Sequence, residues 1–186
     1  KVYNKDIVCV MPTNLYGFND NFNISSAHVI PGMISKFLIA KKKNLKKVKI
    51  WGTGRPIREF IHVADVADAI VKAIETKNNA GKIYEIGGPK IISFGDMVKS
   101  ILNTINKKRF VIDLPMPLAK IQASLLSLMP KPLLTKDQCE ILNEADNVVS
   151  KNHLTLEDLN IKPDDVEQAM SKWLWRFRDG GEFAKI

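Results

Sequence analysis

The sequence predicts an α/β fold in which a mostly parallel sheet is followed by a helical cap. Short apolar runs alternate along the chain with segments whose apolar residues recur every three or four positions. These are the patterns of strands and of amphipathic helices, respectively. The chain has 186 residues, of which 45% are hydrophobic, and this is enough to bury one core of ordinary size.

The first expected strand is Asp6–Met11, a nearly continuous apolar run that ends at Pro12. A run of this kind is typical of a strand that is buried on both faces. A loop rich in Asn, Asp and Gly follows, from Pro12 to Ser26, and loops of this length are often functional. Four further strands are expected, at residues 48–51, 59–63, 82–87 and 109–114.

Three expected helices have clear start signals. The helix over residues 28–40 carries Pro31 in its first turn, where proline is tolerated. Asp65 is expected to cap a helix that ends near residue 75. Ser93 is expected to cap a helix over residues 94–105, with Asp96 as its partner three positions later. Later helical patterns cover residues 117–129, 135–144, 155–159 and 163–177.

The chain is basic, with 28 Lys and Arg residues against 20 Asp and Glu and a formal net charge of +8. Seven lysines fall in the stretch from Lys36 to Lys49. Such a stretch attracts phosphates, nucleic acid or an anionic membrane. The sequence favours a simpler interpretation, a solvated helix end, because cations there complement the helix dipole. Aromatic residues are not interleaved with these lysines and no nucleic-acid-binding module is recognisable, so no nucleic-acid partner is expected.

The cysteine pattern points away from disulfides and metals. The two cysteines, Cys9 and Cys139, lie far apart, and no Cys/His cluster has metal-ligand spacing. This predicts a reducing compartment, taken as the cytoplasm, and no metal site. The first residues do not read as a signal peptide, and the longest apolar segment, residues 114–134, is interrupted by Lys120, Gln122 and Lys131. No membrane-spanning segment is therefore expected.

Several catalytic motifs are not found in the sequence. No glycine-rich dinucleotide fingerprint occurs, and none of the three tyrosines is followed by lysine four positions later. A nucleophile elbow, a Walker loop and an H-E-x-x-H pair are not found either. By itself the chain therefore has no complete catalytic set, and we expect the isolated 186-residue chain to be inactive.

Several long motifs resemble one family. These are Val10–Gly17, Asn19–Phe22, Ser26–Pro31, Trp51–Gly54 with Pro56, and Arg58–Val63. They resemble the GDP-L-fucose synthases, which are extended short-chain dehydrogenase/reductases. The resemblance implies the C-terminal portion of a Rossmann-type enzyme of this kind, with its last parallel strands and a small helical substrate-binding part.

The resemblance also implies how the chain is divided. Residues 1–80 would hold the end of the Rossmann sheet and the substrate loops. Residues 81–186 would hold the remaining α/β elements and the helical C-terminal substrate-binding part. The N-terminal dinucleotide-binding half is expected to be absent, so the implied partners are that half, or a second copy in a homodimer, and a nucleotide-diphosphate sugar.

The implied activity is that of an NADP-dependent nucleotide-sugar epimerase/reductase. Members of the family epimerise GDP-4-keto-6-deoxymannose at two ring carbons and reduce it with NADPH to GDP-L-fucose. Epimerisation beside a ketone needs an acid and a base placed across the sugar. His28 matches the family histidine that serves as one of these groups, and imidazole suits the task because it titrates near neutrality. The alternative is a histidine that only caps the helix beginning there.

The implied cofactor contacts lie on the loop after the first strand. Pro12, Thr13, Asn14 and Leu15 match the segment that passes the nicotinamide end of NADP, with His28 nearby. Backbone amides and the Asn14 side chain would bond the carboxamide or the ribose. The alternative is an asparagine held in a turn, where this residue is common.

The implied substrate contacts are Lys36, Trp51 and Arg58, which match positions that bind the nucleotide diphosphate. Arg58 is the strongest of these, because a guanidinium fork binds a diphosphate with two hydrogen bonds. Lys36 keeps the charge of an arginine found in some relatives but not its fork. Trp51 either packs against the substrate or belongs to the core at a strand end. Glu59, His62 and Asp65 are expected to hold the strand and the helix start.

The second half of the chain resembles a different branch of the same superfamily. Gly81–Pro89, Leu114–Leu118, Leu134–Gln138 and Asp146–Val149 are similar to the NAD(P)H-binding accessory subunit of respiratory complex I and its bacterial relatives. The alternative function is therefore a non-catalytic NAD(P)H-binding accessory or assembly subunit.

Two apolar groups in this half have more than one interpretation. One helical face between residues 115 and 132 is apolar, and core packing is favoured there over a peripheral membrane contact; its members are Leu118, Ile121, Leu125, Leu126 and Met129. The terminal group of Trp173, Trp175 and Phe177 with Arg176 and Arg178 forms either core or a docking face.

Overall fold

The computed structural model describes residues 6–23, 26–51, 54–108, 110–114, 117–118, 121, 124, 146–150 and 152–182, with the backbone alone at 49–51 and 111–114. The elements run in the order β1 (Cys9–Pro12), β2 (Asn14–Tyr16), α1 (Val29–Lys42), β3 (Lys47–Trp51), β4 (Ile57–His62), α2 (Val63–Glu75), β5 (Ile83–Ile86), β6 (Ile91–Ser93), α3 (Phe94–Thr104), β7 (Phe110–Leu114), η1 (Glu157–Leu159), α6 (Val166–Leu174) and η2 (Trp175–Phe177).

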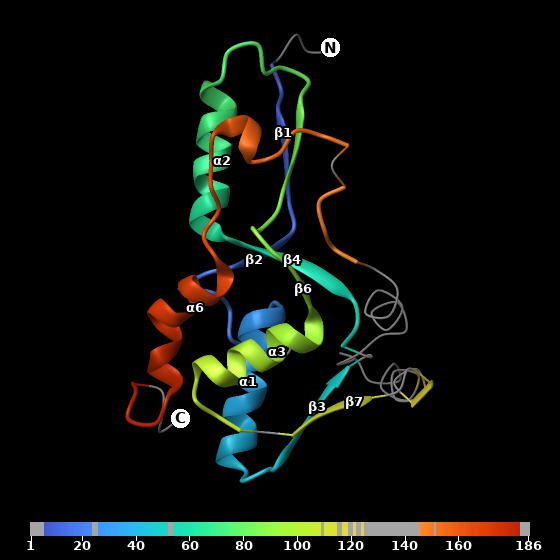
Figure 1. The fold of residues 1–186 in the computed structure, drawn as a ribbon, viewed down its shortest axis with the longest axis vertical. Coiled ribbons are helices and arrows are strands. Elements are labelled where there is room, and N and C mark those ends of the chain that lie inside the picture. Colours follow the sequence, from blue (N-terminus) through green and yellow to red (C-terminus); the bar gives the residue numbers. More distant parts are fainter. Residues whose placement is uncertain are drawn as a thin grey trace.

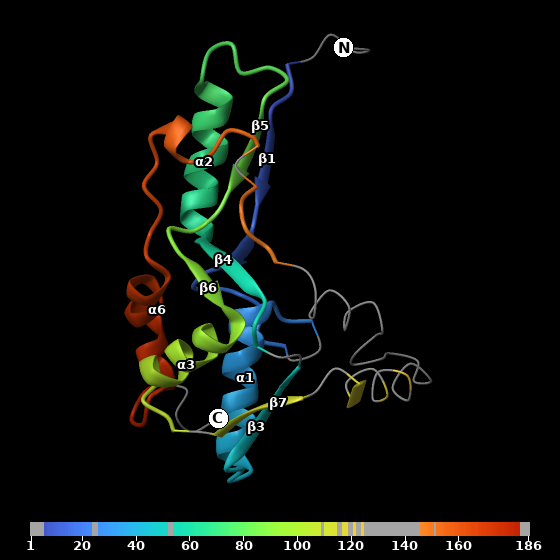
Figure 2. The ribbon, with the colours of Figure 1, turned by 45° about the vertical axis from the view of Figure 1, so that its right-hand side comes forward.

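The described strands form three small sheets. β1 pairs with β5, β2 pairs with β4 and β3 pairs with β7, all in parallel, while β6 adds to β4 in the antiparallel sense. The expected parallel character is confirmed, but the strands do not lie in one sheet. Figure 1 and Figure 2 show an elongated molecule, with β1, β5 and α2 at one end and β3, β7 and the C-terminal end of α1 at the other.

Strand β1 is not buried on both faces, so that expectation was wrong. Val8 and Val10 pack into a core cluster with α2, whereas Cys9 is exposed and Met11 is 48% exposed. Successive side chains of a strand point to opposite faces, and α2 covers only one of them. An apolar run predicts a strand, but it does not show what covers each face.

Two strands lie where the sequence predicted no strand. β2 interrupts the expected loop of residues 12–26, and β6 precedes α3. Both have three residues, and both pair with β4. For β2 this partner lies about 40 residues later in the chain, and for β6 it lies before α2. Three residues are too few to show a period of two, so long-range pairing decides these strands.

The three helices predicted from start signals are found, with one change of cap. α1 begins after His28 with Pro31 in its first turn, and the Ser93 hydroxyl accepts a hydrogen bond from the Asp96 amide at 3.0 Å. α2, however, begins at Val63 and not after Asp65. Its cap is His62, whose Nδ1 accepts a hydrogen bond from the Ala64 amide at 3.3 Å, and Asp65 lies in the first turn.

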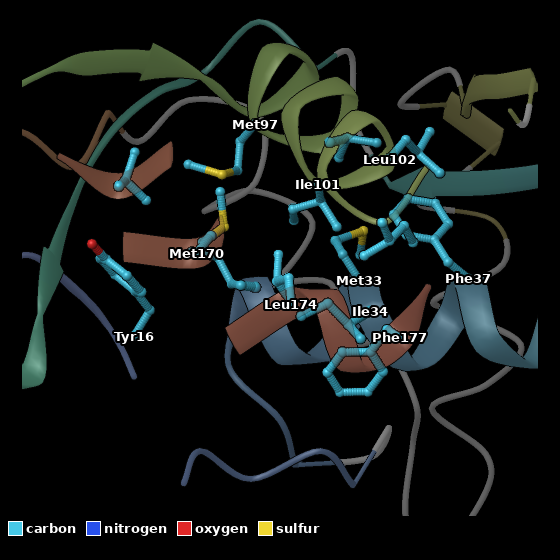
Figure 3. Close-up of a cluster of buried hydrophobic side chains, with 14 of the residues drawn as sticks. Tyr16, Met33, Ile34, Phe37, Met97, Ile101, Leu102, Met170, Leu174 and Phe177 are labelled. Carbon is cyan, nitrogen blue, oxygen red and sulfur yellow. The ribbon is translucent and has the colours of Figure 1, made fainter. Parts of the chain in front are cut away.

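The core is divided into two clusters. The larger one lies between α1, α3 and α6, and Figure 3 shows its side chains interdigitating, among them Tyr16, Ile34, Phe37, Met97, Ile101, Met170 and Leu174. The smaller one lies between α2, β5 and η1. Each cluster draws residues from both sides of position 80, so packing joins the two segments that carry the two resemblances.

The terminal aromatic group is mainly core. Trp173 and Phe177 are buried and contact Phe22, while Trp175 is 50% exposed. The helix expected over residues 163–177 is shorter, comprising α6 and η2, because Asp165 caps α6 by accepting hydrogen bonds from two amides of its first turn.

Parts of the expected helical region lie outside the described residues. The helix expected over 135–144 is wholly outside them, and that over 117–129 is described at four positions. Of its apolar face, Leu118 and Ile121 are described, and both are more than half exposed. Over the described part of the chain, no helix combines the length and the apolar character needed to cross a bilayer.

Candidate functional site

The carboxyl ends of β1 and β5 meet at one edge of their sheet. Pro12 is paired with Ile86, and the Thr13 amide donates a hydrogen bond to the Ile86 carbonyl at 2.9 Å. In α/β folds, ligands bind in the crevice beyond the carboxyl ends of parallel strands. The segment from Pro12 to Leu15, predicted to contact the cofactor, follows β1 at this edge.

Thr13 provides a test of whether this edge fits a ligand. Its Oγ1 atom is buried and forms no hydrogen bond with the described residues. A buried hydroxyl without a partner is costly. An acceptor or donor on a bound cofactor would satisfy it, so the residues present fit a nicotinamide group at this position.

Two glycines follow β5 at the same edge because β4 passes very close to them. A Cβ atom on Gly88 would lie 2.0 Å from the Phe60 carbonyl oxygen, and one on Gly87 would lie 1.6 Å from Glu59 Oε2. No side chain fits at Gly88, where the backbone of β4 blocks it, and a side chain at Gly87 would displace the Glu59 carboxylate and Val149. The glycines therefore allow the end of β5 to approach the strand that carries Arg58.

The strand register places several predicted site residues on one face. Asn14 is paired with Phe60 and Tyr16 with His62, and paired residues share a face of a sheet, as do residues two apart on one strand. Arg58 therefore lies on the same face as Asn14. Tyr16 and Phe60 pack into the larger core cluster with α1, so this face is turned toward the helix that begins after His28 and carries Lys36.

Of the two predicted phosphate-binding cations, Arg58 is buried and Lys36 is partly buried. Arg58 is only 6% exposed, and its Nη1 donates a hydrogen bond to the Ile57 carbonyl at 3.3 Å. Burial lowers the pKa of Arg58, and the carboxylate of Asp146 partly offsets this effect. Burial also lowers the pKa of Lys36. Because burial disfavours the charged form of both groups, an anionic ligand would stabilise them.

Asp146 and its neighbours were not identified as site residues from the sequence. The Ile57 amide donates to Asp146 Oδ1 at 2.9 Å, and the Glu59 amide donates to the Asn147 carbonyl at 3.0 Å. The segment of residues 146–149 therefore lies along β4 and flanks Arg58 from outside the first 80 residues. The sequence shows an acidic residue at 146, but it does not show that this residue contacts β4.

His28 occupies the N-cap position of α1, but its side chain forms no capping hydrogen bond and is exposed. His28 is thus the cap residue that the alternative expected, and its carbonyl accepts a hydrogen bond from the Gly32 amide at 2.8 Å. Its role as an acid or base stays a prediction. Two cavities, one beside Phe22 and Trp173 and one beside Ser100 and Glu167, are not lined by His28 or Arg58. That His28 and Arg58 face one shared cleft stays a prediction.

Asn14 and Trp51, a predicted cofactor contact and a predicted substrate contact, both lie on parallel strands. The Asn14 side-chain amide donates a hydrogen bond to the Glu59 carbonyl at 2.9 Å and ties β2 to β4. Trp51 is the last residue of β3 and pairs with Leu114, and its side chain lies outside the described part of the structure.

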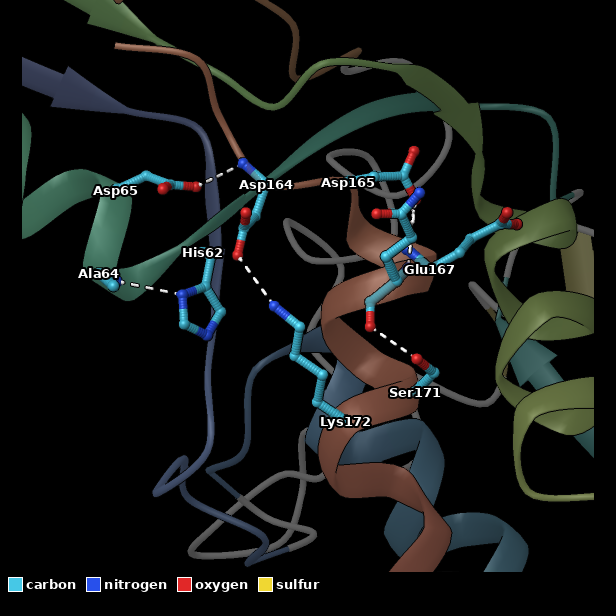
Figure 4. A network of polar contacts seen from close by, with 9 residues as sticks. His62, Ala64, Asp65, Asp164, Asp165, Glu167, Ser171 and Lys172 are labelled. Carbon is cyan, nitrogen blue, oxygen red and sulfur yellow. Dashed lines mark hydrogen bonds and ion pairs between the residues drawn. The ribbon is translucent and has the colours of Figure 1, made fainter.

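The three residues expected to be structural do hold the strand and the helix start. Glu59 accepts a hydrogen bond from the Val149 amide at 3.4 Å. Figure 4 shows His62 accepting from Ala64, and Asp65 accepting from the Asp164 amide at 3.0 Å. Asp65 thereby joins the first turn of α2 to the segment that leads into α6.

A cavity of about 260 Å³ lies outside the predicted site. It is lined by Phe18, Asn19, Asp20, Phe22, Trp173, Arg176 and Phe177. The Arg176 guanidinium lies 4.5 Å from the centre of the Phe18 ring. The aromatic residues at both ends of this cavity were visible in the sequence, but their meeting depends on the docking of α6 against the loop after β2.

No described cluster of three or more His, Cys, Asp or Glu side chains has the geometry of a metal site.

Comparison with known proteins agrees with this arrangement. Residues 1–87 match the family model described as the NAD dependent epimerase/dehydratase family. GDP-L-fucose synthase 1 of Arabidopsis thaliana is 52% identical over 99 residues, which are 52% of this chain and 31% of the relative. GDP-L-fucose synthase of Escherichia coli K12 is 48% identical over 73 residues, 39% of this chain and 23% of that protein.

Solved structures extend the similarity of fold to most of the chain. A GDP-6-OMe-4-keto-L-xylo-heptose reductase from C. jejuni has a TM-score of 0.64 at 20% identity, covering 94% of this chain and 54% of that one. A GDP-L-fucose synthetase from Naegleria fowleri bound to NADP has a TM-score of 0.59 at 19% identity, covering 90% and 44%.

The chain spans a fifth to about a third of the length of the curated relatives first matched. The resemblance of residues 81–186 to complex I accessory subunits is not carried by these matches and stays a prediction. Residues 1–87 match the NAD dependent epimerase/dehydratase family, and most of the chain shares the fold of solved nucleotide-sugar epimerases and synthetases.

Proposed function

We propose that this chain forms the substrate-side portion of an NADP-dependent nucleotide-sugar epimerase/reductase that converts GDP-4-keto-6-deoxymannose to GDP-L-fucose. The observation that carries the proposal is the buried Arg58 of β4, which lies on the same face of the β2–β4 pair as Asn14, the face turned toward α1. The names of the relatives matched over this region support the same substrate.

In this proposal Arg58 binds the diphosphate of the sugar nucleotide. Its guanidinium is held on one side by the Ile57 carbonyl, and the phosphates would restore the solvation that burial removes. Lys36 adds a second positive charge from α1. Because burial lowers the pKa of both groups, binding of the dianionic diphosphate would favour their charged forms.

His28 is proposed to act as an acid or base in epimerisation. Its side chain is exposed and takes no part in capping α1, so both ring nitrogens are available for proton transfer to or from a sugar carbon. NADPH, when bound, supplies the hydride that reduces the ketone. Thr13 and Asn14 would hold its nicotinamide end, with the unsatisfied Thr13 hydroxyl as one hydrogen-bonding group.

The surface around β1 supports completion by a dinucleotide-binding half. Among the described strands β1 pairs with β5 alone, so one edge of β1 is open. Ile7 beside it is 68% exposed and Met11 is 48% exposed. On α2, Ile70 and Ile74 are 44% and 70% exposed. Apolar side chains around an open strand edge favour a further strand and helix as the covering elements.

The test is GDP binding to the 186-residue chain, measured by calorimetry. Arg58→Ala should weaken binding by about tenfold to a hundredfold, the effect of losing charge-assisted hydrogen bonds worth about 1.5–3 kcal/mol. Arg58→Lys should recover part of this loss. Lys77→Ala, which removes an exposed charge in the turn after α2, should bind GDP like the unmodified chain. Equal affinity of Arg58→Ala and the unmodified chain would refute the role of Arg58.

Catalysis is tested separately. The isolated chain should not oxidise NADPH in the presence of the 4-keto sugar. Co-expression with the part of Arabidopsis GDP-L-fucose synthase 1 that precedes the matched stretch should restore NADPH consumption, and His28→Gln in the same complex should abolish epimerisation. Restored binding of both ligands without any turnover would instead support the non-catalytic accessory subunit.

A further inference from the structure

Two lysine-rich turns meet at the end of the molecule opposite β1. One joins α1 to β3 and contains Lys43 and Lys46, with Lys42 and Lys47 at the adjoining ends of α1 and β3, and the other joins α3 to β7 and contains Lys108. β3 and β7 pair in parallel with Lys47 opposite Phe110, and the Phe110 amide donates to the Lys46 carbonyl at 3.2 Å. These five lysines, here called the basic end, are all exposed.

A single aspartate ties the same two turns together from the other side. Asp179 bonds to Lys41 at 3.1 Å and also to Lys107. This carboxylate joins Lys41 in the last turn of α1 to Lys107 in the turn after α3, and the five lysines of the basic end are exposed. The tertiary structure therefore concentrates positive charge from two distant segments.

Both turns have a fixed backbone. Asn44 and Asn106 adopt the left-handed conformation, with φ of 50° and 54°. The Leu45 amide donates to the Ala40 carbonyl at 2.8 Å, and the Lys107 amide donates to the Leu102 carbonyl at 2.9 Å. This is the pattern of a helix closed by a left-handed residue. The backbone positions from which the lysines extend are thus defined in both turns.

Two large apolar side chains stand among these lysines. Leu45 lies between Lys43 and Lys46 and is 47% exposed, and Phe110 is 72% exposed. The dipole of α1 explains lysines in its last turn, but it explains neither the lysines beyond the helix nor the exposed apolar residues. Apolar side chains surrounded by cations are the combination that binds the interface of an anionic bilayer.

Completion of the fold would leave this surface uncovered. Figure 1 and Figure 2 show β3 and β7 at the opposite end of the long axis from β1 and α2. A dinucleotide-binding half added at the open edge of β1 would therefore lie away from the basic end.

We propose that the basic end docks the protein peripherally on an anionic lipid bilayer, with Leu45 and Phe110 entering the interface. The lysines provide the attraction to acidic headgroups, and the two apolar side chains provide the part of the binding that salt does not screen. A nucleic acid would use the same charge but gives Leu45 no function, since this side chain has no flat face on which a base can stack.

The experiment is co-sedimentation of the 186-residue chain with vesicles of phosphatidylcholine, with and without phosphatidylglycerol, at low and high salt. The chain should sediment with the anionic vesicles and remain in solution with the neutral ones. Lys46→Glu with Lys47→Glu should weaken binding by about tenfold or more. The matched control is Lys77→Glu with Lys82→Glu, two exposed lysines near the opposite end, which should bind like the unmodified chain.

The apolar contribution has its own variant. Leu45→Ser with Phe110→Ser should weaken binding by a similar factor at low and at high salt, because it removes the part that salt does not screen, whereas the effect of the charge reversal should shrink at high salt. If a charge reversal unfolds the chain, Lys46→Gln with Lys47→Gln replaces it, with circular dichroism as the check. The proposal would be overturned if the chain bound neutral vesicles as well as anionic ones, or if it bound single-stranded RNA but not vesicles. It would also be overturned if either the lysine variant at 46 and 47 or the apolar variant at 45 and 110 bound like the unmodified chain. The assay uses no nucleotide, so its outcome is independent of the proposed enzymatic function.

Discussion

Tyr16 lies edge-on against His62, with ring centroids 5.3 Å apart and ring planes at 69°. The two residues are paired across β2 and β4, and the contact joins the larger core cluster to the cap of α2. The Tyr16 side chain is 1% exposed, and its hydroxyl has no hydrogen-bonding partner among the described residues. Burial raises the pKa of Tyr16, and the charges of Asp65, Asp164 and Asp165 raise it further.

The Tyr16→Phe variant should therefore be as stable as the unmodified chain, or more stable by up to about 1 kcal/mol, because it removes an unsatisfied polar group from the core. Urea unfolding measures the difference. The matched control is Tyr84→Phe, whose hydroxyl donates to Asn79 Oδ1 at 2.7 Å in a buried position. This variant should lose about 1–2 kcal/mol. A larger loss for Tyr16→Phe than for Tyr84→Phe would contradict the assignment.

Asn79 links α2 to β5 through two buried hydrogen bonds. Its Nδ2 donates to the Ala73 carbonyl at 2.5 Å, while its Oδ1 accepts from Tyr84. Asn79→Ala should cost about 2–3 kcal/mol, because it leaves two buried groups without partners. In combination with Tyr84→Phe the loss should be smaller than the sum of the single losses, since the two residues share one bond. Additive losses in urea unfolding would show that they act independently.

Asp65 should make stability fall as the pH rises. Burial raises the pKa of Asp65 above the ordinary value, and the charge of Asp164 raises it further. The hydrogen bond that Asp65 accepts from the Asp164 amide lowers the pKa in part. When the pKa is higher in the folded state, the protonated carboxyl contributes its whole stabilisation below the pKa of the unfolded state, near pH 4. This contribution is lost as the pH rises through the pKa of the folded state. Asp65→Asn keeps an acceptor for the Asp164 amide without the charge.

Asp65→Asn should accordingly unfold at a higher temperature than the unmodified chain at pH 7. The gain in the free energy of unfolding should be under about 1 kcal/mol, because the group is partly solvated. The difference should disappear below about pH 4. Glu75→Gln, at the exposed far end of the same helix, serves as the control for the removal of a charge. A less stable Asp65→Asn at pH 7 would show that the carboxylate is favoured in the folded state.

Gly88 should not tolerate any side chain. A Cβ atom there would lie 2.0 Å from a backbone oxygen of β4, so Gly88→Ala should cost about 2–3 kcal/mol through displacement of one strand. Gly95→Ala is the matched control, because the nearest atom to its Cβ would be 3.3 Å away and the residue lies in α3, where alanine is favoured. Similar unfolding temperatures for the two variants would contradict the close approach of β4 to β5.

The local elements could be predicted where the sequence period is long enough. α1, α3 and the strands β3, β4 and β5 lie where apolar spacing and caps placed them. β2 and β6 could not be predicted, because three residues show no period and their partners on β4 are distant. The cap of α2 was assigned to Asp65 because aspartate is a frequent cap, whereas the structure uses the imidazole of His62.

The candidate site depended on the resemblance more than on any spacing. The motifs selected Thr13, Asn14, His28 and Arg58, but no pattern in them shows that Asn14 and Arg58 share a face. That result comes from the register of β2 against β4. The unsatisfied hydroxyl of Thr13 and the position of Asp146 beside Arg58 likewise follow from packing between segments far apart in sequence.

The lysines illustrate the same division. The sequence alone determined that the chain is basic, that seven lysines follow closely on one another from Lys36 to Lys49, and which short segments form helices and strands. These properties depend on neighbours along the chain. Only the tertiary structure decided that Lys108 and Phe110 join Lys46 and Lys47 on one surface, through the pairing of β3 with β7. Such pairing depends on the free energy of contacts between distant segments, which local sequence does not contain.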